Sequence, residues 1–279
     1  MTARGRGIGL ALCVAMILSY TLVWASEGQE TDKYLLSGDQ HYESFDNKSA
    51  LDMYRKAYEL NPDSFKTLLK LTRTLIDVGE DLNSKESEAY YEEAVKYSEL
   101  LKENFPESPY TYACLASSYG YLAIFRGGKE KIRLSNNVTE NAYKAIALDP
   151  DYEVPYIVLG TYYREVANLS PFLRVFAEMF LGDVPNGSHD DSIECLKKAL
   201  QIRPDSVYTV TELAKTYASM RKYDSAMASL RNVLKMSVVD HLDPRLRQEA
   251  DEKILVLKRK LSRRLARGNN KFRRYSGAN

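Results

Sequence analysis

The chain has 279 residues, of which 44% are hydrophobic and 28% are charged. This composition supplies a sizeable core and excludes an intrinsically disordered protein. Lysine and arginine number 39 against 38 acidic residues, so a formal net charge of +1 excludes recognition of a polyanion through overall charge. The composition indicates a folded protein whose partners are selected by local surfaces.

The N-terminal 25 residues have the layout of a secretory signal peptide. Arg4 and Arg6 precede an apolar run at residues 8–24 without an acidic residue, and Ala25 supplies a small residue at the cleavage position. We expect residues 1–25 to be removed on export, with a periplasmic location in a bacterium and a secreted or lumenal one in a eukaryote. An uncleaved membrane anchor is the alternative, because the run approaches the roughly 20 apolar residues that span a bilayer.

Residues 34–64 carry the spacing of a tetratricopeptide repeat, a two-helix unit of about 34 residues. Tyr34, Gly38, Ala50, Tyr54, Ala57 and Pro62 fall on the signature positions of this motif. Small residues at two of these positions let the paired helices approach closely, and the proline ends the second helix because it has no amide N–H. The segment therefore predicts a helical hairpin that stacks on further copies of itself.

The same proline ending recurs along the chain. It is found at Pro62, Pro106, Pro150 and Pro204, with spacings longer than the repeat unit. We therefore predict insertions between the two helices of repeats two, three and four, at residues 77–87, 126–136 and 169–191. A fifth repeat starts at Val207 and lacks the terminal proline. The repeats together predict an all-α superhelical solenoid over residues 26–240.

A capping helix is predicted after the fifth repeat. Asp243 and Pro244 form a helix start, and apolar residues recur at steps of three and four from Leu246 to Leu265. We expect this helix, at residues 241–267, to cover the open face of the last repeat. Residues 268–279 lack a periodic pattern and predict a disordered tail.

The third and fourth repeats carry more than the general motif. Residues 144–170, a hydrophobic insertion and residues 190–206 follow one another, and residues 118–132 form a distinctive third-repeat segment. This part of the chain, roughly residues 108–260, resembles the regulator of microtubule dynamics family. The resemblance implies a tetratricopeptide scaffold without catalytic activity. Some animal members of that family are membrane-anchored and implicated in lipid binding.

No catalytic motif accompanies the repeats. The chain has no HExxH, GxSxG, phosphate-loop or paired CxxC sequence. His189, Asp190, Asp191 and Glu194 could form a metal cluster, but Ser188 and Asp191 have the spacing of a helix-capping box, which is the alternative. We predict that the protein is not an enzyme and has no metal or cofactor.

The first helices of the repeats line the concave face of such a solenoid. The motif positions that face inward predict a groove of mixed character. It is formed by Tyr42, Arg73, Tyr110, Tyr121, Arg164, Glu165, Tyr208 and Lys215. Tyrosine offers a large contact area with a polar tip, so a protein partner is favoured and nucleic acid is not expected. The alternative for the tyrosines is a place in the core.

The insertion in repeat four predicts a short helix between Ser170 and Gly182 that is apolar nearly all round. Its large side chains are Phe172, Leu173, Val175, Phe176, Met179, Phe180 and Leu181. Such a helix must be covered. Either it plugs the core, or it forms a lid over a cavity for a lipid or another apolar ligand, which is the alternative function.

Basic residues oppose the apolar stripe of the capping helix. They are Lys258, Arg259, Lys260, Arg263, Arg264 and Arg267, and no acidic residue follows Glu252. This pattern predicts contact with an anionic membrane surface. A solvated helix end, with cations that favour the helix dipole, is the alternative.

Overall fold

The computed structural model describes residues 28–276, except residues 83 and 182–186, and every regular element in those ranges is a helix. Side chains are not described at residues 180, 181 and 267–276. The predicted signal segment at residues 1–25 lies outside the described part. Within that part, no helix combines the length and the apolar character that crossing a bilayer requires.

The helices follow one another with short connections. In chain order they are residues 28–43, α2 Asn47–Leu60, α3 Phe65–Leu82, α4 Ser87–Asn104, α5 Pro109–Arg126, α6 Gly128–Leu148, α7 Val154–Ala167, α8 Pro171–Leu181, α9 His189–Ile202, α10 Val207–Ser219, α11 Tyr223–Val233 and α12 Asp243–Ser276.

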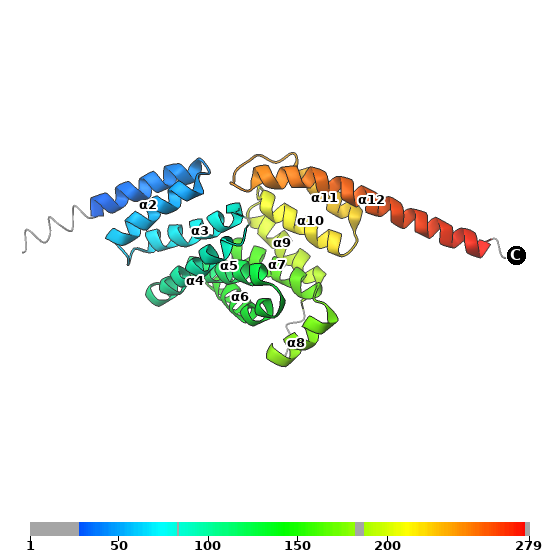
Figure 1. The fold of residues 1–279 in the computed structure, drawn as a ribbon, viewed down its shortest axis with the longest axis horizontal. Coiled ribbons are helices and arrows are strands. Elements are labelled where there is room, and N and C mark those ends of the chain that lie inside the picture. Colours follow the sequence, from blue (N-terminus) through cyan, green and yellow to red (C-terminus); the bar gives the residue numbers. More distant parts are fainter. Residues whose placement is uncertain (1–27, 83, 182–186, 277–279) are drawn as a thin grey trace, which may run out of the picture. The chain divides into compact units, whose positions relative to one another are not determined.

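The helices pair as successive hairpins (Figure 1). The chain divides after Pro106 into two compact units. The first contains residues 28–43 paired with α2, and α3 paired with α4. The second contains the pairs α5–α6, α7–α9 and α10–α11, followed by α12. The predicted all-α fold of five tetratricopeptide-type repeats and a capping helix is confirmed.

Small residues set the distance between paired helices. A Cβ atom on Gly38 would lie 2.4 Å from Cε1 of Tyr54, and one on Gly160 would lie 2.6 Å from Cγ of Leu196. Ala50 and Ala57 are completely buried. The motif residues therefore act in packing, as their spacing predicts. Each of the four prolines follows the last turn of a second helix. The residue directly before each proline donates its backbone N–H to a carbonyl oxygen of that turn.

The predicted insertions in repeats two and three are wrong in form, because the extra residues lengthen the helices. Helix α3 continues to Leu82 through Gly79, and α6 begins at Gly128, directly after α5 and Gly127. Gly79 is no break, since the ring of Tyr91 occupies the place of its missing side chain at 2.4 Å. In repeat four, the insertion forms the predicted separate helix α8.

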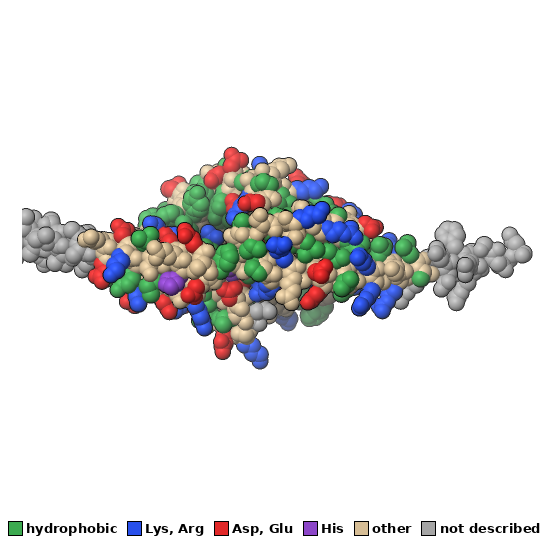
Figure 2. All heavy atoms as spheres, turned by 90° about the horizontal axis from the view of Figure 1, so that it is seen from above, with side chains coloured by type: hydrophobic (Ala, Val, Ile, Leu, Met, Phe, Trp, Pro, Cys, Tyr) green, Lys and Arg blue, Asp and Glu red, His purple; other side chains and the backbone are tan. Residues whose placement is uncertain are grey.

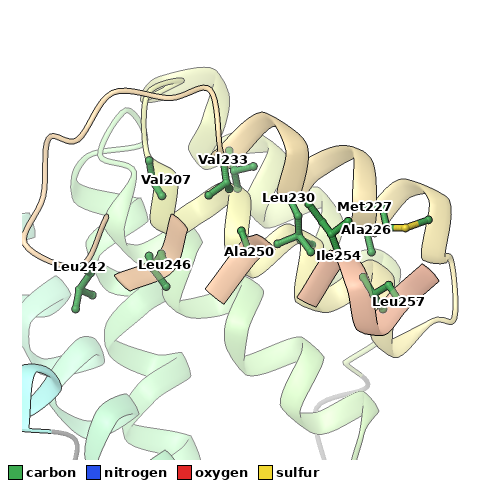
Figure 3. Packing of buried hydrophobic residues seen from close by; sticks show 12 residues of the cluster. Val207, Ala226, Met227, Leu230, Val233, Leu242, Leu246, Ala250, Ile254 and Leu257 are labelled. Atoms are coloured by element: carbon green, nitrogen blue, oxygen red, sulfur yellow. The ribbon is translucent and has the colours of Figure 1, made fainter. Parts of the chain in front are cut away.

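Helix α12 caps the second unit, as predicted. Its apolar residues pack against α11 and α10, and Figure 3 shows Ile254 and Leu257 beside Leu230 and Met227 of α11. The backbone of α12 is helical as far as Ser276, beyond the predicted end of the capping helix at residue 267, and the disorder expected of residues 268–279 stays a prediction. Extending an existing helix costs little per residue, and the single Gly268 is a weak break. Residues 277–279 lie outside the described part.

The close approach at Gly160 leads to a stability prediction. Gly160→Val should lower the free energy of unfolding by roughly 2 kcal/mol, because overpacking forces helices apart. The added carbon would meet Leu196 and lie 3.2 Å from the carbonyl oxygen of Ser192. Urea denaturation followed by circular dichroism measures the change.

Gly120→Ala in α5 is the matched control, since a Cβ atom there would meet nothing within 4 Å. It should stabilise the helix by up to about 1 kcal/mol. A Gly160→Val protein as stable as the parent would show that the α7–α9 spacing is not set by this glycine.

Candidate functional site

A buried ion pair joins the first helices of repeats four and five. Nη1 of Arg164 in α7 donates to Oε2 of Glu212 in α10 at 2.5 Å. Only 7% of Arg164 and 2% of Glu212 are exposed. The arginine also donates to the backbone carbonyl of Glu212 at 3.3 Å. Two charges removed from water in this way must be paired, so the contact fixes α7 against α10.

Further charges extend this pair into a network. Nζ of Lys215 donates to the second oxygen of Glu212 at 2.5 Å, and Lys131 of α6 pairs with Glu165. Tyr208 of α10 acts electrostatically on Arg164, and its hydroxyl accepts a hydrogen bond from that of Tyr121 in α5 at 3.4 Å. The network thus links α5, α6, α7 and α10, and its cations outnumber its carboxylates.

The carboxyl of Glu212 stays ionised in this setting. Burial raises its pKa, but the charges of Lys215 and Arg164 outweigh burial and lower the pKa to about 2. For Arg164, burial lowers the pKa, while Glu212 and Glu165 raise it above its ordinary value. Both groups therefore carry full charge at neutral pH.

The network gathers five of the predicted groove residues. Tyr121, Arg164, Glu165, Tyr208 and Lys215 interact within the second unit. Glu212 and Lys131 were not predicted. Glu212 is at a motif position that faces the neighbouring helix, and Lys131 belongs to a segment interpreted as an insertion. Glu212 could have been predicted only from the burial of Arg164, because a buried arginine requires a carboxylate partner.

A groove lies beside the network, where α12 runs along α10. It has a volume of 260 Å³ and is lined by Thr211, Ala214, Lys215, Ala218, Leu230, Lys253, Val256, Leu257 and Lys260. The floor is apolar, and three lysines stand around it. Thr211, Lys215 and Ala218 follow one another at steps of four and three, so one face of α10 forms one wall.

The remaining predicted groove residues lie elsewhere. Tyr42 and Arg73 are together in the first unit, where the guanidinium lies 5.0 Å from the centre of the tyrosine ring. The hydroxyl of Tyr42 donates to Oδ2 of Asp77 at 2.9 Å. In the second unit, Tyr110 is 42% exposed, and its ring packs against Tyr152 in the turn before α7.

Helix α8 is only partly covered. It packs against α6, with Ala177 buried and Lys129 lying 4.8 Å from the centre of the Phe176 ring. The described chain itself leaves part of the apolar surface of this helix open, because Phe172, Val175 and Met179 are 69%, 58% and 76% exposed. The side chain of Phe180 lies outside the described residues. An apolar-ligand cavity beneath this helix stays a prediction.

The basic residues of α12 are at the surface. Lys258, Arg259, Lys260, Arg263 and Arg264 are exposed, and Figure 2 shows Lys and Arg side chains gathered near that end of the described chain. Nη1 of Arg264 donates to the carbonyl oxygen of Arg221 at 3.2 Å. The side chain of Arg267 is outside the described part. Contact of these residues with an anionic membrane stays a prediction.

The cluster around His189 has a structural role. Ser188 and Asp191 form the predicted capping box at the start of α9, and Nε2 of His189 lies 3.0 Å from Oδ1 of Asn168. Cys114 and Cys195 are not joined in a disulfide. Burial raises the pKa of the Cys195 thiol to about 11, so it is protonated and unreactive at neutral pH.

Comparison with known sequences gives a family. The sequence profile described as regulator of microtubule dynamics protein 1-3 matches residues 34–258. The chain is 28% identical over 123 residues to regulator of microtubule dynamics protein 2 of Bos taurus, covering 44% of this chain and 30% of that protein. It is 23% identical over 194 residues to protein 1 of the same organism, covering 68% and 61%. The chain thus matches less than two thirds of either relative.

Comparison with solved structures gives the fold. A tetratricopeptide protein of Thermus thermophilus superposes with a TM-score of 0.60 at 21% identity, covering 81% of this chain and 99% of that one. A monomeric mutant of IFIT1 superposes with a TM-score of 0.51 at 18% identity, covering 79% and 45%. Both likenesses concern the architecture of the repeats.

The Arg164–Glu212 pair leads to a prediction on pH dependence. The folded-state pKa of Glu212, about 2, lies below the ordinary value of 4.5, so its stabilisation is present above pH 4.5 and is lost as the pH falls toward 2. Glu212→Gln should destabilise the protein by roughly 3 kcal/mol at neutral pH, because it removes the buried carboxylate that pairs with Arg164. Urea titrations between pH 2 and pH 7 measure both effects.

In the Glu212→Gln protein, stability should therefore fall less steeply with acid than in the parent. Glu194→Gln is the control, since Glu194 is exposed on α9. It should leave stability and its pH dependence nearly unchanged. Parallel pH profiles for the parent and Glu212→Gln proteins would refute the role of this carboxylate.

Proposed function

The chain belongs to the regulator of microtubule dynamics family, and from this premise we propose that it is a non-catalytic scaffold that binds a protein partner in the groove between α10 and α12. The tetratricopeptide fold supports the class of function, because such hairpins present their first helices as an extended binding surface. The groove indicates where on the repeats the partner would bind.

The proposal rests on the combination of a fixed helix, α10, with exposed side chains on the facing helix, α12. The buried Arg164–Glu212 pair holds α10 against α7, while Lys215, one turn away, is 40% exposed at the groove. Val256 on the opposite wall is 46% exposed. A preorganised surface with an accessible apolar side chain and cations at its edge is suited to a partner that inserts a side chain.

We also propose that the scaffold is exported. The support is the layout of residues 1–25, with two arginines, a long apolar run and a small residue before Ser26. The mature protein isolated from its native source should lack these residues. Its intact mass decides the point, and a chain that still begins at Met1 and stays with the membrane would favour an anchor.

Position-specific cross-linking tests the groove. A photoreactive amino acid at position 256, introduced into the full chain in its native cells, should give a cross-linked partner upon irradiation. Leu255 is the control position, because it is the neighbouring residue, is 52% exposed and does not line the groove. Since consecutive residues of a helix point about 100° apart, only the first position faces the groove.

The yield at position 256 should exceed that at position 255 several-fold. Equal yields at the two positions would place any partner elsewhere. Absence of a cross-link at position 256 would contradict the proposed function.

A further inference from the structure

We infer that the partner segment seated in the α10–α12 groove is an acidic stretch of polypeptide with one apolar side chain among its carboxylates. This inference rests on the proposed function, which it extends from a binding place to the chemistry of the bound chain. Three features of the groove carry it: the distribution of charge around it, the nature of its floor, and its size.

The charge around the groove is unbalanced. Lys215 shares Glu212 with Arg164, and Nζ of Lys253 lies 2.6 Å from Oε2 of Glu249. Lys260 lines the groove one helical turn after Val256 and adds a positive charge beyond these pairs. Arg263 and Arg264 follow on the next turn, and no acidic residue occurs after Glu252. The rim therefore attracts carboxylates.

The floor of the groove requires an apolar group. Between the lysines lie Ala214, Ala218, Leu230, Val256 and Leu257. A ligand that offered only charge would strip water from these side chains without replacing it by apolar contact. A peptide satisfies both demands, because successive side chains leave its backbone in different directions and an apolar residue can enter while its neighbours face the rim.

The size of the groove fits one side chain. Its volume of 260 Å³ is smaller than the roughly 300–1,000 Å³ of sites that enclose a whole small molecule. Its lining comes from neighbouring helices and includes exposed side chains, such as Val256 and Lys215, so the site can be reached from the surface. An extended or helical segment of a protein is therefore the occupant that this shape accepts.

The experiment selects binders from a library of random nine-residue peptides displayed on phage, with the full-length protein as target. The library is neutral in charge, so any preference comes from the protein. The selected peptides should carry Asp or Glu on both sides of a large apolar residue. Their affinity, measured on synthetic copies by fluorescence anisotropy, should fall as salt is added, because the rim contacts are exposed to solvent.

Two pairs of variants test the two features of the groove. Lys260→Glu should weaken the selected peptides by roughly tenfold, while Lys258→Glu, with the same change of net charge on the same helix, should have little effect. Val256→Asn should weaken them by a similar factor, and Leu255→Asn should not. All four positions are at the surface, so the fold is expected to tolerate the changes.

The outcomes separate this inference from the proposed function. Peptides that depend on Val256 but carry no excess of acid, or that bind Lys260→Glu and Lys258→Glu equally, would overturn the acidic partner and leave the groove as the binding place. Peptides that are insensitive to Val256 and to Lys260, or a library that yields no binder, would overturn it too. In that case the cross-linking yield at position 256 decides whether the proposed function fails with it.

Discussion

The buried pair between Arg164 and Glu212 is the interaction on which the second unit depends. Hydrophobic contacts hold each hairpin together, but they tolerate sliding of one helix past another. The buried ion pair does not tolerate such sliding, because the guanidinium must lie 2.5 Å from a carboxylate whose residue is only 2% exposed. The pair thus converts a general attraction between α7 and α10 into a defined register. It also sets the direction in which Lys215 leaves the helix, because this lysine shares the same carboxylate.

The groove inherits its shape from two kinds of packing. On one side, the polar network fixes α10. On the other, the apolar cluster of Leu246, Ala250, Ile254 and Leu257 seats α12 on the last hairpin. Neither side needs a ligand to stay in place, so binding would cost little ordering of the protein itself. The cap therefore has two roles: it covers the end of the repeats and supplies the second wall of a surface that α10 alone would leave open.

Much of the fold follows from local rules, while the site does not. The hairpins and their ends could be predicted because glycine, alanine and proline act at fixed spacings within one repeat. The lengthened helices could not be predicted, because the sequence does not distinguish the roles of Gly79 and Gly127. Gly79 makes room for the ring of Tyr91 within a helix, whereas Gly127 has a φ of 61° between two helices. The division after Pro106 was also hidden, because the residues there resemble the other repeat ends. Of the residues that line the groove between α10 and α12, only Lys215 was predicted by motif position. In the adjoining network, Glu212 and Lys131 required the tertiary arrangement.

Helix α8 lies outside the part of repeat four that holds the repeat together. Helices α7 and α9 pair directly with each other, and Gly160 of α7 packs on Leu196 of α9. Ala177 packs α8 against α6, whereas exposed side chains such as Phe172 and Met179 are under weak constraint from the core. Exchanging this segment would give the chain a new exposed face while the α7–α9 hairpin stays the same.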